Sequence, residues 1–483
     1  MLLLRDADDI ITVDATRRVL RRASIVIDGA SIAAIGSTEE IDAQYAGRIP
    51  PDAVIDASKT LIAPGFINTH VHTMEHLSRG LIPDNLATRP WVLGYFFPFQ
   101  AEMTEREAYI SARLACLDML RCGTTCFIDS SILNANRYVD AVAQAVDELG
   151  LRAVLGRGVC DKPPSDLPDY FREQWRRNIF SSTEAALAEA KSLLQAWSAR
   201  SSSRVRAWAT VFGLFTLCSD ALFTGIKRLA DDYGVGTNFH MASSLGEAQE
   251  LEARAGVWPI TQLERLGALG PNVLLTHAVA VRDEEVAILA RHGVRIAHCP
   301  GAALRLAKGA TQIGKIPEML AQGIPVSLGA DGVCSSGTFD HARLLFLVAG
   351  LFKDARMDAT LIPAETALEM ATLNGAKGLL WDDEIGSLAV GKKADLIQYD
   401  IHRPEWVPPH DMVRNLVYSA DGGSIKNVIV DGQVLVRDRR ATRVDEGRLL
   451  DEACEAGLAI ARRVGLDPRS KWPAQDAGGC CGA

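Results

Sequence analysis

The chain has 483 residues, of which 48% are hydrophobic and 23% are charged, so it can fold around a large core with room for a smaller second unit. A formal net charge of −9, without a sustained lysine or arginine cluster, argues against nucleic acid as the main partner. The apolar start of the chain is interrupted at once by Arg5 and Asp6. We therefore expect neither a signal peptide nor a membrane span, and a cytoplasmic protein.

Both ends of the chain carry short alternating runs of apolar and polar residues. Residues 1–59 contain Asp28-Gly29 between two such runs, and the same texture returns around Asp431-Gly432. We expect residues 1–59 and 385–440 to form one small β-sandwich together. Residues 441–483 are expected to form a C-terminal helix and a flexible tail. Cys480 and Cys481 lie in that tail, where disorder is favoured over an adventitious thiol metal site.

The region from residue 60 to 384 alternates apolar strands with amphipathic helices, which is typical of a parallel sheet or barrel. A capping box of Thr104 and Glu107 predicts a helix through Leu120, and a second helix is expected from Asp283 to Arg291. Eight strands are expected, with C-terminal ends at residues 72, 129, 156, 211, 240, 277, 298 and 331. We therefore predict an α/β fold, a (β/α)8 TIM-like barrel with the small β-sandwich.

Polar side chains stand at the ends of several of these strands. His70 and His72 are two residues apart, so both point to the same face of a strand and can bind one metal ion. Other expected strands end at His240, His277, His298 and Asp331. Each could alone be a satisfied core residue, but the joint placement at the C-terminal face of a barrel indicates a metal centre. Cys299 is expected to point to the opposite face, into the core.

The chain resembles the amidohydrolase superfamily, in particular the cytosine, guanine and S-adenosylhomocysteine deaminases and the triazine hydrolases. The resemblance covers about residues 5 to 440. The motifs that carry it lie at residues 64–72, 275–277, 297–300, 328–332, 385–396 and 428–432.

The resemblance implies a divalent metal ion held by His70, His72, His240 and Asp331. It implies that His277 hydrogen-bonds the activated water, that a further histidine, His298, contacts substrate, and that the protein is a homo-oligomer, a dimer or larger. Zn²⁺ is the first choice of metal for this donor set, and Fe²⁺, Mn²⁺ and Co²⁺ also fit. Chemically, Asp331 can accept a proton from water and His277 can orient it, so these two are the expected catalytic residues.

One position departs from the pattern. The family carries a glutamate three residues after the fifth-strand histidine, where this chain has Ser243. A serine hydroxyl is no general acid near neutral pH, and loss of a positioned proton donor costs about 10²–10⁴-fold in rate. Glu247 and Glu250 follow, and either a loop turns one of them inward or both form the solvated start of a helix. The second interpretation is favoured.

The substrate is expected to meet apolar residues. The segment 73–100 would lie over the barrel mouth and includes Trp91, while Phe212 stands where many deaminases have a Pro-His pair. Either aromatic group could instead be plain packing. Arg305 and Lys308 could meet an anionic or carbonyl group, or face solvent. The expected substrate-binding residues are His298, Ser243, Trp91, Phe212 and Arg305.

The combined pattern predicts a metal-dependent amidohydrolase in which activated water displaces an amine, ammonia or another leaving group from an N-heterocycle or a related apolar small molecule. The alternative is hydrolysis of a carbamate, thiocarbamate or urea, which would lessen the need for the missing glutamate. A non-catalytic metal-binding homologue is the third class. The intact ligand set argues against it, because a buried polar cluster is costly to keep without a use.

Overall fold

The computed structural model describes residues 1–133, 136–198, 204–466 and 472. Its centre holds two parallel four-stranded sheets, ordered β6-β7-β8-β9 and β10-β11-β12-β13. The strands are β6 (Phe66–Asn68), β7 (Thr124–Ile132), β8 (Arg152–Arg157), β9 (Val205–Ala207), β10 (Thr237–Met241), β11 (Val273–His277), β12 (Arg295–His298) and β13 (Val326–Leu328).

Backbone hydrogen bonds close these two sheets into one barrel. At one seam the Thr69 N–H donates to the Leu328 carbonyl at 3.0 Å, and Val71 pairs with Asp331. At the other seam the His240 N–H donates to the Phe212 carbonyl at 3.1 Å. The predicted eight-stranded α/β barrel is therefore confirmed, and both seams run through residues expected at the site.

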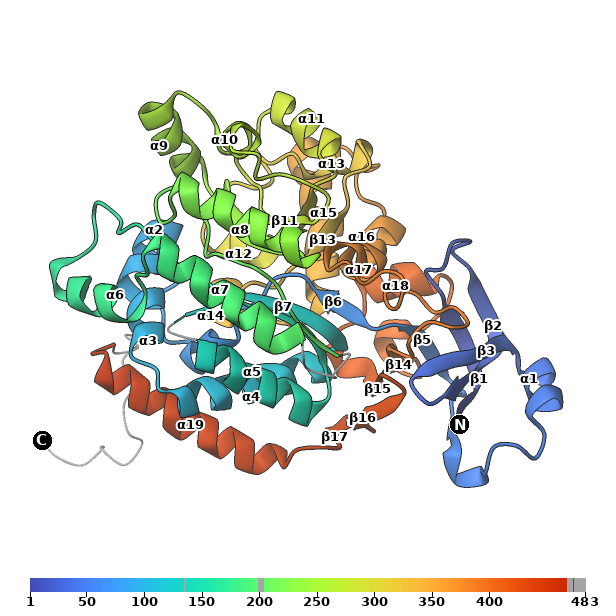
Figure 1. The fold of residues 1–483 in the computed structure, drawn as a ribbon. Coiled ribbons are helices and arrows are strands. Elements are labelled where there is room, and N and C mark those ends of the chain that lie inside the picture. The colour runs from blue at the N-terminus through green and yellow to red at the C-terminus, as the bar shows by residue number, and fades with distance from the viewer. Residues whose placement is uncertain (134–135, 199–203, 467–471, 473–483) are drawn as a thin grey trace, which may run out of the picture.

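Helices surround the barrel (Figure 1). The predicted capping box is present, since the Thr104 hydroxyl accepts the Glu107 N–H and starts α4 (Glu105–Arg121). The helix expected from Asp283 is α11 (Asp283–Arg291). The others after successive barrel strands are α2 (Thr88–Trp91), α3 (Phe97–Ala101), α5 (Asn136–Leu149), α6 (Arg172–Asn178), α7 (Thr183–Ser198), α8 (Asp220–Tyr233), α9 (Leu245–Ala255), α10 (Pro259–Arg265), α12 (Pro300–Arg305), α13 (Ile316–Ala321), α14 (Val333–Ser336), α15 (His341–Arg356), α16 (Ala364–Ala371) and α17 (Leu373–Gly378).

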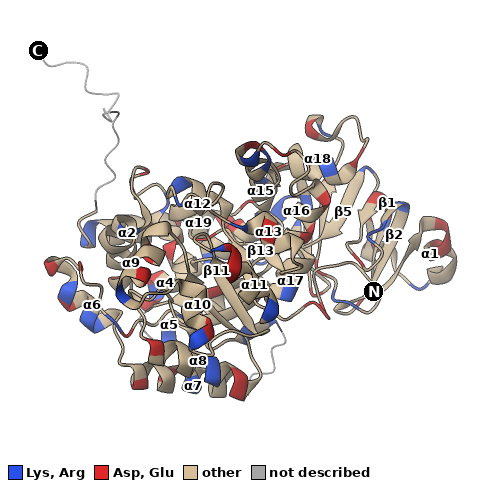
Figure 2. Cartoon of the chain, turned by 90° about the horizontal axis from the view of Figure 1, so that it is seen from above, with Lys and Arg blue, Asp and Glu red and all other residues tan. Residues whose placement is uncertain are grey.

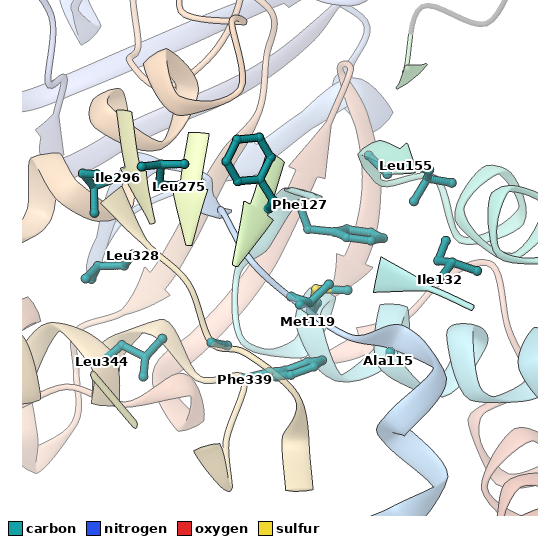
Figure 3. Packing of buried hydrophobic residues seen from close by; sticks show 14 of the residues in the cluster. Ala115, Met119, Phe127, Ile132, Leu155, Leu275, Ile296, Leu328, Phe339 and Leu344 are labelled. Atoms are coloured by element: carbon teal, nitrogen blue, oxygen red, sulfur yellow. The ribbon is translucent and has the colours of Figure 1, made fainter. Parts of the chain in front are cut away.

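Apolar side chains from the barrel strands and the surrounding helices form the main core (Figure 3). One fully buried residue from each of five strands illustrates it: Phe127, Leu155, Leu275, Ile296 and Leu328. Burying side chains of this size contributes about 1.5–3 kcal/mol each, so the polar strand ends rest on a rigid apolar base.

Strands from both chain ends form a second, nine-stranded sheet in the order β17-β16-β15-β14-β5-β1-β2-β3, with β4 beside β1. The antiparallel β5–β14 pair joins the two ends, as predicted. The sheet is hydrogen-bonded continuously, and one face packs an apolar cluster from both ends. Its strands are β1 (Leu2–Ile11), β2 (Val19–Asp28), β3 (Ser31–Ser37), β4 (Val54–Asp56), β5 (Thr60–Pro64), β14 (Leu396–Asp400), β15 (Ile425–Val430), β16 (Gln433–Arg437) and β17 (Arg440–Ala441).

The apolar run that the sequence analysis treats as one strand up to His72 is two strands. Its first part, β5, belongs to the terminal sheet, and the barrel begins with β6 after Gly65. A Cβ at Gly65 would come within 2.2 Å of the Thr125 hydroxyl, so glycine lets the chain pass from one sheet to the other. Apolar composition alone does not reveal such a crossing.

The remaining helices lie outside the barrel order. They are α1 (Thr38–Tyr45), α18 (Met412–Tyr418) and the expected C-terminal helix α19 (Glu446–Arg463), which packs on α4. Cys480 and Cys481 lie outside the described residues. Within the described part, no helix is long and apolar enough to cross a membrane. Lysine and arginine alternate with acidic residues over the helices in Figure 2.

A buried arginine ties the barrel to the terminal sheet. Arg152 on β8 is fully buried; its Nε donates to Asp395 Oδ2 at 2.7 Å, and its Nη2 donates to Asp431 Oδ1 at 2.5 Å. Asp395 precedes β14 and Asp431 follows β15, so the motifs at residues 385–396 and 428–432 meet on one guanidinium.

Replacing Arg152 with methionine should lower the free energy of unfolding by about 3–5 kcal/mol, because it leaves the buried Asp395 carboxylate and the half-buried Asp431 carboxylate without their partner. Urea denaturation measures the change. Arg172→Met is the matched control, since its ion pair with Asp169 is exposed, and it should cost less than about 1 kcal/mol. Equal losses of stability in the two variants would contradict the role of Arg152 in joining the barrel to the terminal sheet.

Candidate active site

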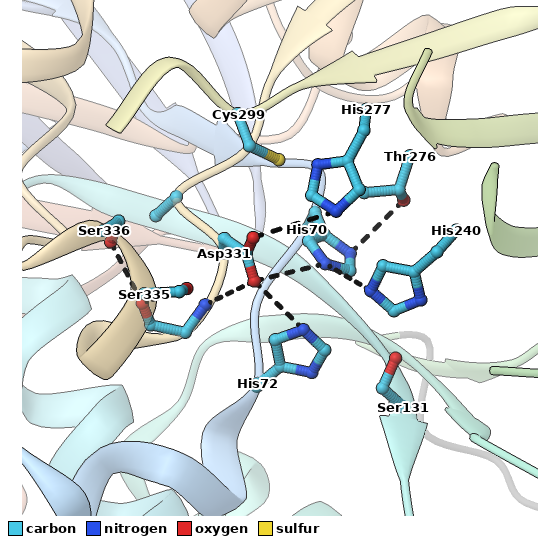
Figure 4. A network of polar contacts seen from close by, with 12 residues as sticks. His70, His72, Ser131, His240, Thr276, His277, Cys299, Asp331, Ser335 and Ser336 are labelled. Atoms are coloured by element: carbon cyan, nitrogen blue, oxygen red, sulfur yellow. Dashed lines mark hydrogen bonds and ion pairs between the residues drawn. The ribbon is translucent and has the colours of Figure 1, made fainter. Parts of the chain in front are cut away.

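Four histidines and one aspartate converge at the C-terminal mouth of the barrel (Figure 4). Asp331 Oδ1 lies 3.1 Å from His72 Nε2 and 3.6 Å from His70 Nε2. His240 Nε2 lies 3.1 Å from His70 Nε2, and His277 Nε2 lies 3.9 Å from Asp331 Oδ2. All five side chains are buried. The structure therefore brings together the predicted ligands and catalytic residues.

The backbone aims two of these side chains against the simple strand pattern. In the β10–β11 register His240 pairs with Thr276, and Met241 pairs with His277. Alternation alone would turn His277 to the outer face with Met241. His277 instead has φ 79° and Asp331 has φ 65°, left-handed values that are uncommon for residues with a Cβ. These two turns place both side chains inside the mouth.

Hydrogen bonds fix the imidazoles with Nε2 toward the centre. His240 Nδ1 lies 2.5 Å from the Phe212 carbonyl oxygen, so it carries the hydrogen and donates it. His70 Nδ1 lies 3.3 Å from the Thr276 hydroxyl. Such outer partners set the tautomer and leave the Nε2 lone pair free for a cation.

The charges in the cluster are balanced by one proton. Burial raises the pKa of Asp331, but hydrogen bonds from His70 and His72 hold it well below its usual range. Burial lowers the pKa of His72, yet Glu75 and Asp331 more than offset this and raise it to about 9. Burial lowers the pKa of His70 and of His240, so both stay neutral. Without a cation, His72 holds the compensating positive charge.

This donor set fits a divalent metal ion. His70, His72 and Asp331 offer ligand atoms within 4.8 Å of one another, and so do His70, His240 and His277. Three neutral imidazoles and a carboxylate are donors that Zn²⁺ and its neighbours accept. A cation bound by His70, His72, His240 and Asp331 would lower the pKa of a water toward neutrality.

Two further buried residues lie near the cluster. β12 ends at His298, so Cys299 lies past the strand, and its thiol comes within 4.8 Å of ligand atoms of His277 and Asp331. Cys299 is 1% exposed, as expected for a core residue, and its thiol lies on the cluster side of the core. Lys308 is buried, with Nζ 3.1 Å from His277 Nε2. Of its two sequence interpretations, solvent exposure is excluded.

A buried glutamate that the sequence analysis missed lies behind His72. Glu75 Oε1 is 3.7 Å from His72 Nδ1, and the Cys334 thiol donates to Glu75 Oε2 at 2.6 Å. Burial raises the pKa of Glu75 to about 8. The only sequence signal is its position three residues after His72, which puts it on the same side of a helical turn.

An aromatic wall borders the imidazoles. The Phe212 ring lies 4.6 Å from the His240 ring, and Phe96 lies 5.4 Å from His72. Trp91 stands behind, 5.3 Å from Phe96. These distances are those of packed aromatic pairs. The expected aromatic residues thus lie at the site, Phe212 in direct contact with a predicted ligand and Trp91 one layer away.

Position 243 has an unexpected neighbour. Ser243 is buried, and its N–H donates to Glu247 Oε2 at 2.7 Å. Glu247 is buried as well, so its interpretation as a solvated helix start was wrong. The carboxylate folds back because Ser244 caps α9 and residue 247 lies in the first turn of that helix. Glu250, one turn further on, is largely exposed and pairs with Arg89 at 2.9 Å, as expected for a solvated residue.

The last two predicted substrate contacts lie elsewhere. His298 is buried, stands 5.9 Å from the Phe352 ring, and lines a separate cavity of about 280 Å³ with Leu304 and Ala307. The Arg305 guanidinium donates to the Ile82 carbonyl at 2.9 Å. Arg305 therefore holds the loop that follows the first barrel strand.

Zinc affinity of the metal-free protein should rise about tenfold per pH unit between about pH 6.5 and 8.5. The pKa of His72 is raised to about 9, so below that value binding must release its proton, and each step up in pH lowers that cost. Chelator competition at several pH values measures the slope. His298→Asn should keep the slope, since His298 lies in another cavity, and a pH-independent affinity in the wild type would contradict the charge balance.

The comparisons with known proteins agree with this geometry. Residues 61–435 match the model of the amidohydrolase family. The chain is 32% identical over 457 residues to a 5'-deoxyadenosine deaminase of Methanosarcina mazei, covering 94% of this chain and 97% of that one.

Two solved structures with zinc are also similar. An adenosine deaminase from Xanthomonas campestris matches with a TM-score of 0.85 and 26% identity, over 95% of this chain and 98% of that one. An atrazine chlorohydrolase from Arthrobacter aurescens matches with a TM-score of 0.84 and 26% identity, over 95% and 100%. With its family motifs on a closed barrel, the chain belongs to the amidohydrolase family and is a hydrolase of the kind that acts on carbon–nitrogen bonds.

Proposed function

We propose that this protein is a zinc-dependent aminohydrolase that removes an amino group from an apolar N-heterocycle of the 6-aminopurine type. The observation that carries the proposal is the buried cluster of imidazoles and a carboxylate directly beneath an aromatic wall. The named activities of the deaminase relatives and the zinc in the related structures support it.

The roles proposed for the residues follow from their positions. His70, His72, His240 and Asp331 hold the metal, and Asp331 also accepts a proton from the attacking water. His277 orients that water. The Lys308 ammonium, 3.1 Å from His277 Nε2, helps to keep this imidazole neutral, because both burial and the nearby positive charge lower its pKa.

The proposed substrate is flat and apolar around its reactive carbon. Phe96 and Phe212 contact the rings of two predicted ligands, so the proposed heterocycle would lie against these faces when it is bound beside the metal. Stacking on such rings is worth about 0.5–1.5 kcal/mol beyond the area buried.

A second candidate is the hydrolysis of a carbamate, thiocarbamate or urea. The specific observation in its favour is Ser243, because such substrates release better leaving groups and depend less on a glutamate at that position. The related deaminases favour the first candidate.

The zinc-loaded protein should release ammonia from 5'-deoxyadenosine or another 6-aminopurine, and removal of zinc should abolish the release. An enzyme-coupled ammonia assay over a panel of aminopurines, aminotriazines, carbamates and ureas measures this. Turnover of carbamates or ureas alone would support the second candidate, and failure on the whole panel with about one zinc bound per chain would refute both.

Phe96→Ala should raise KM for the best heterocycle about tenfold with a smaller change in kcat, because a stacking face is lost while the metal residues stay. Steady-state kinetics measures the split. Phe346→Ala is the control, since Phe346 is 53% exposed on α15, and it should leave both constants unchanged. An unchanged KM in Phe96→Ala would remove Phe96 from the binding wall.

We further propose a homo-oligomer that works in the cytoplasm. α19 leaves Leu450 and Leu458 49% and 54% exposed beside a groove of about 800 Å³, an apolar surface suited to a second copy. The eight cysteines in the described residues are free thiols, which suits a reducing compartment. Light scattering of the purified chain tests the oligomer.

A further inference from the structure

We propose that Glu247 is a catalytic residue that carries the proton which the family pattern assigns to position 243. The inference rests on the proposed aminohydrolase function and deepens it. Ser243 removes the usual carboxyl group from the strand end, and Glu247 brings another back from one helical turn further along the chain.

The position of Glu247 is fixed by the start of α9. The Ser244 hydroxyl caps α9 by accepting the Glu247 N–H at 3.3 Å, which holds Glu247 in the first turn. From there its Oε2 accepts the Ser243 N–H at 2.7 Å. The carboxylate is thereby anchored at the residue where the glutamate of related deaminases begins its side chain.

The second carboxylate oxygen of Glu247 is available to a ligand. Glu247 is 8% exposed, and its Oε1 is buried with no hydrogen-bond partner among the described residues. A buried carboxylate oxygen without a donor costs free energy unless a ligand or water satisfies it. Glu247 also lines a cavity of about 220 Å³ with Val92, Leu93 and Leu214, a place where such a ligand fits.

Two contacts link this cavity to the metal cluster. The Leu214 N–H donates to the His240 backbone carbonyl at 3.1 Å, so the cavity wall is adjacent along the backbone to the residue whose imidazole enters the cluster. Lys308 supplies a second link, because its ammonium contacts His277 and interacts electrostatically with Glu247. Burial raises the pKa of Glu247 to about 7, which suits a group that both accepts and donates a proton near neutral pH.

The proposed step balances within the reaction. As the water oxygen bonds to the ring carbon, one water proton passes to the Glu247 carboxylate. The resulting carboxylic acid donates that proton to the departing nitrogen while the carbon–nitrogen bond breaks with its electron pair. The second water proton passes to Asp331 and from there to a ring nitrogen of the heterocycle, neutral amine or ammonia leaves, and both carboxylates are regenerated.

The test compares zinc-loaded, full-length variants on the best substrate of the panel. Glu247→Gln keeps the shape and can still accept the Ser243 N–H, yet should lower kcat by about 10²–10⁴-fold with little change in KM. Ser243→Glu added to Glu247→Gln should restore much of the rate, because it returns a carboxylate to the strand end. Glu252→Gln, on the same helix, is the matched control and should behave as wild type, since its carboxylate is exposed, pairs with Arg282 and does not line this cavity.

Two results would overturn the inference. One is a wild-type kcat in Glu247→Gln. The other is a loss that Ser243→Glu does not restore and that comes with lost zinc or a lowered Tm, since that marks a structural role. Zinc content and thermal unfolding are measured for every variant.

A measurement that does not depend on substrate turnover tests the role of Glu247 separately from the proposed function. In protein labelled with ¹³C at glutamate, the Glu247 carboxyl signal is identified as the one that is absent from the spectrum of Glu247→Gln. In the wild type this signal should titrate with a pKa of about 7 and shift when zinc is added. If no substrate is found, the proposed function fails while this titration still judges Glu247. An ordinary glutamate pKa with no response to zinc would overturn the inference.

Discussion

The structure depends on one buried carboxylate at the barrel mouth. Asp331 is 4% exposed, and an isolated charge there would cost several kcal/mol in lost hydration. His70 and His72, just after the first barrel strand, offset this cost. The same residues close the barrel, because the Asp331 N–H donates to the His70 carbonyl at 2.8 Å. Barrel closure and assembly of the site are therefore one event.

Further buried ionisable groups surround this centre and alternate in charge. Glu75 lies against His72, Lys308 against His277, and Glu247 within the field of Lys308. In a low-dielectric interior each such group shifts the pKa of the next. A dication in the cluster would displace the proton of His72. Metal loading must therefore also change the protonation of the groups behind the ligands.

The sequence predicted the parts of the site that follow strand periodicity. His70 and His72 share a face because they are two residues apart, and the barrel follows from alternating strands and helices. His277 sits inside only because its backbone is left-handed, which the motif indicated and the periodicity did not. The division at Gly65 was also hidden, because β5 and β6 are equally apolar.

Residues on loops and helix starts were harder to predict. Lys308 and Glu247 both lie beyond their strands, where the path of the chain decides between interior and solvent. Charge favoured solvent for Glu247, but its cap and the Ser243 N–H turned it inward. For Arg305, as for Lys308, the sequence allowed either contact with a polar group or exposure to solvent. In the structure Arg305 donates to a backbone carbonyl of the loop after the first barrel strand.

In the proposed mechanism, Ser243 connects substrate specificity to catalysis. A serine at the strand end is smaller than a glutamate, so it leaves open the cavity lined by Val92, Leu93 and Leu214. In the proposed mechanism, moving the carboxylate by one helical turn keeps a proton carrier and leaves this cavity beside Ser243. A substrate with an apolar group next to its reactive carbon gains burial in that volume, at about 25 cal/mol per Å². Under this proposal the departure from the family pattern favours bulky, apolar substrates, and Glu247 lines the cavity that would take them.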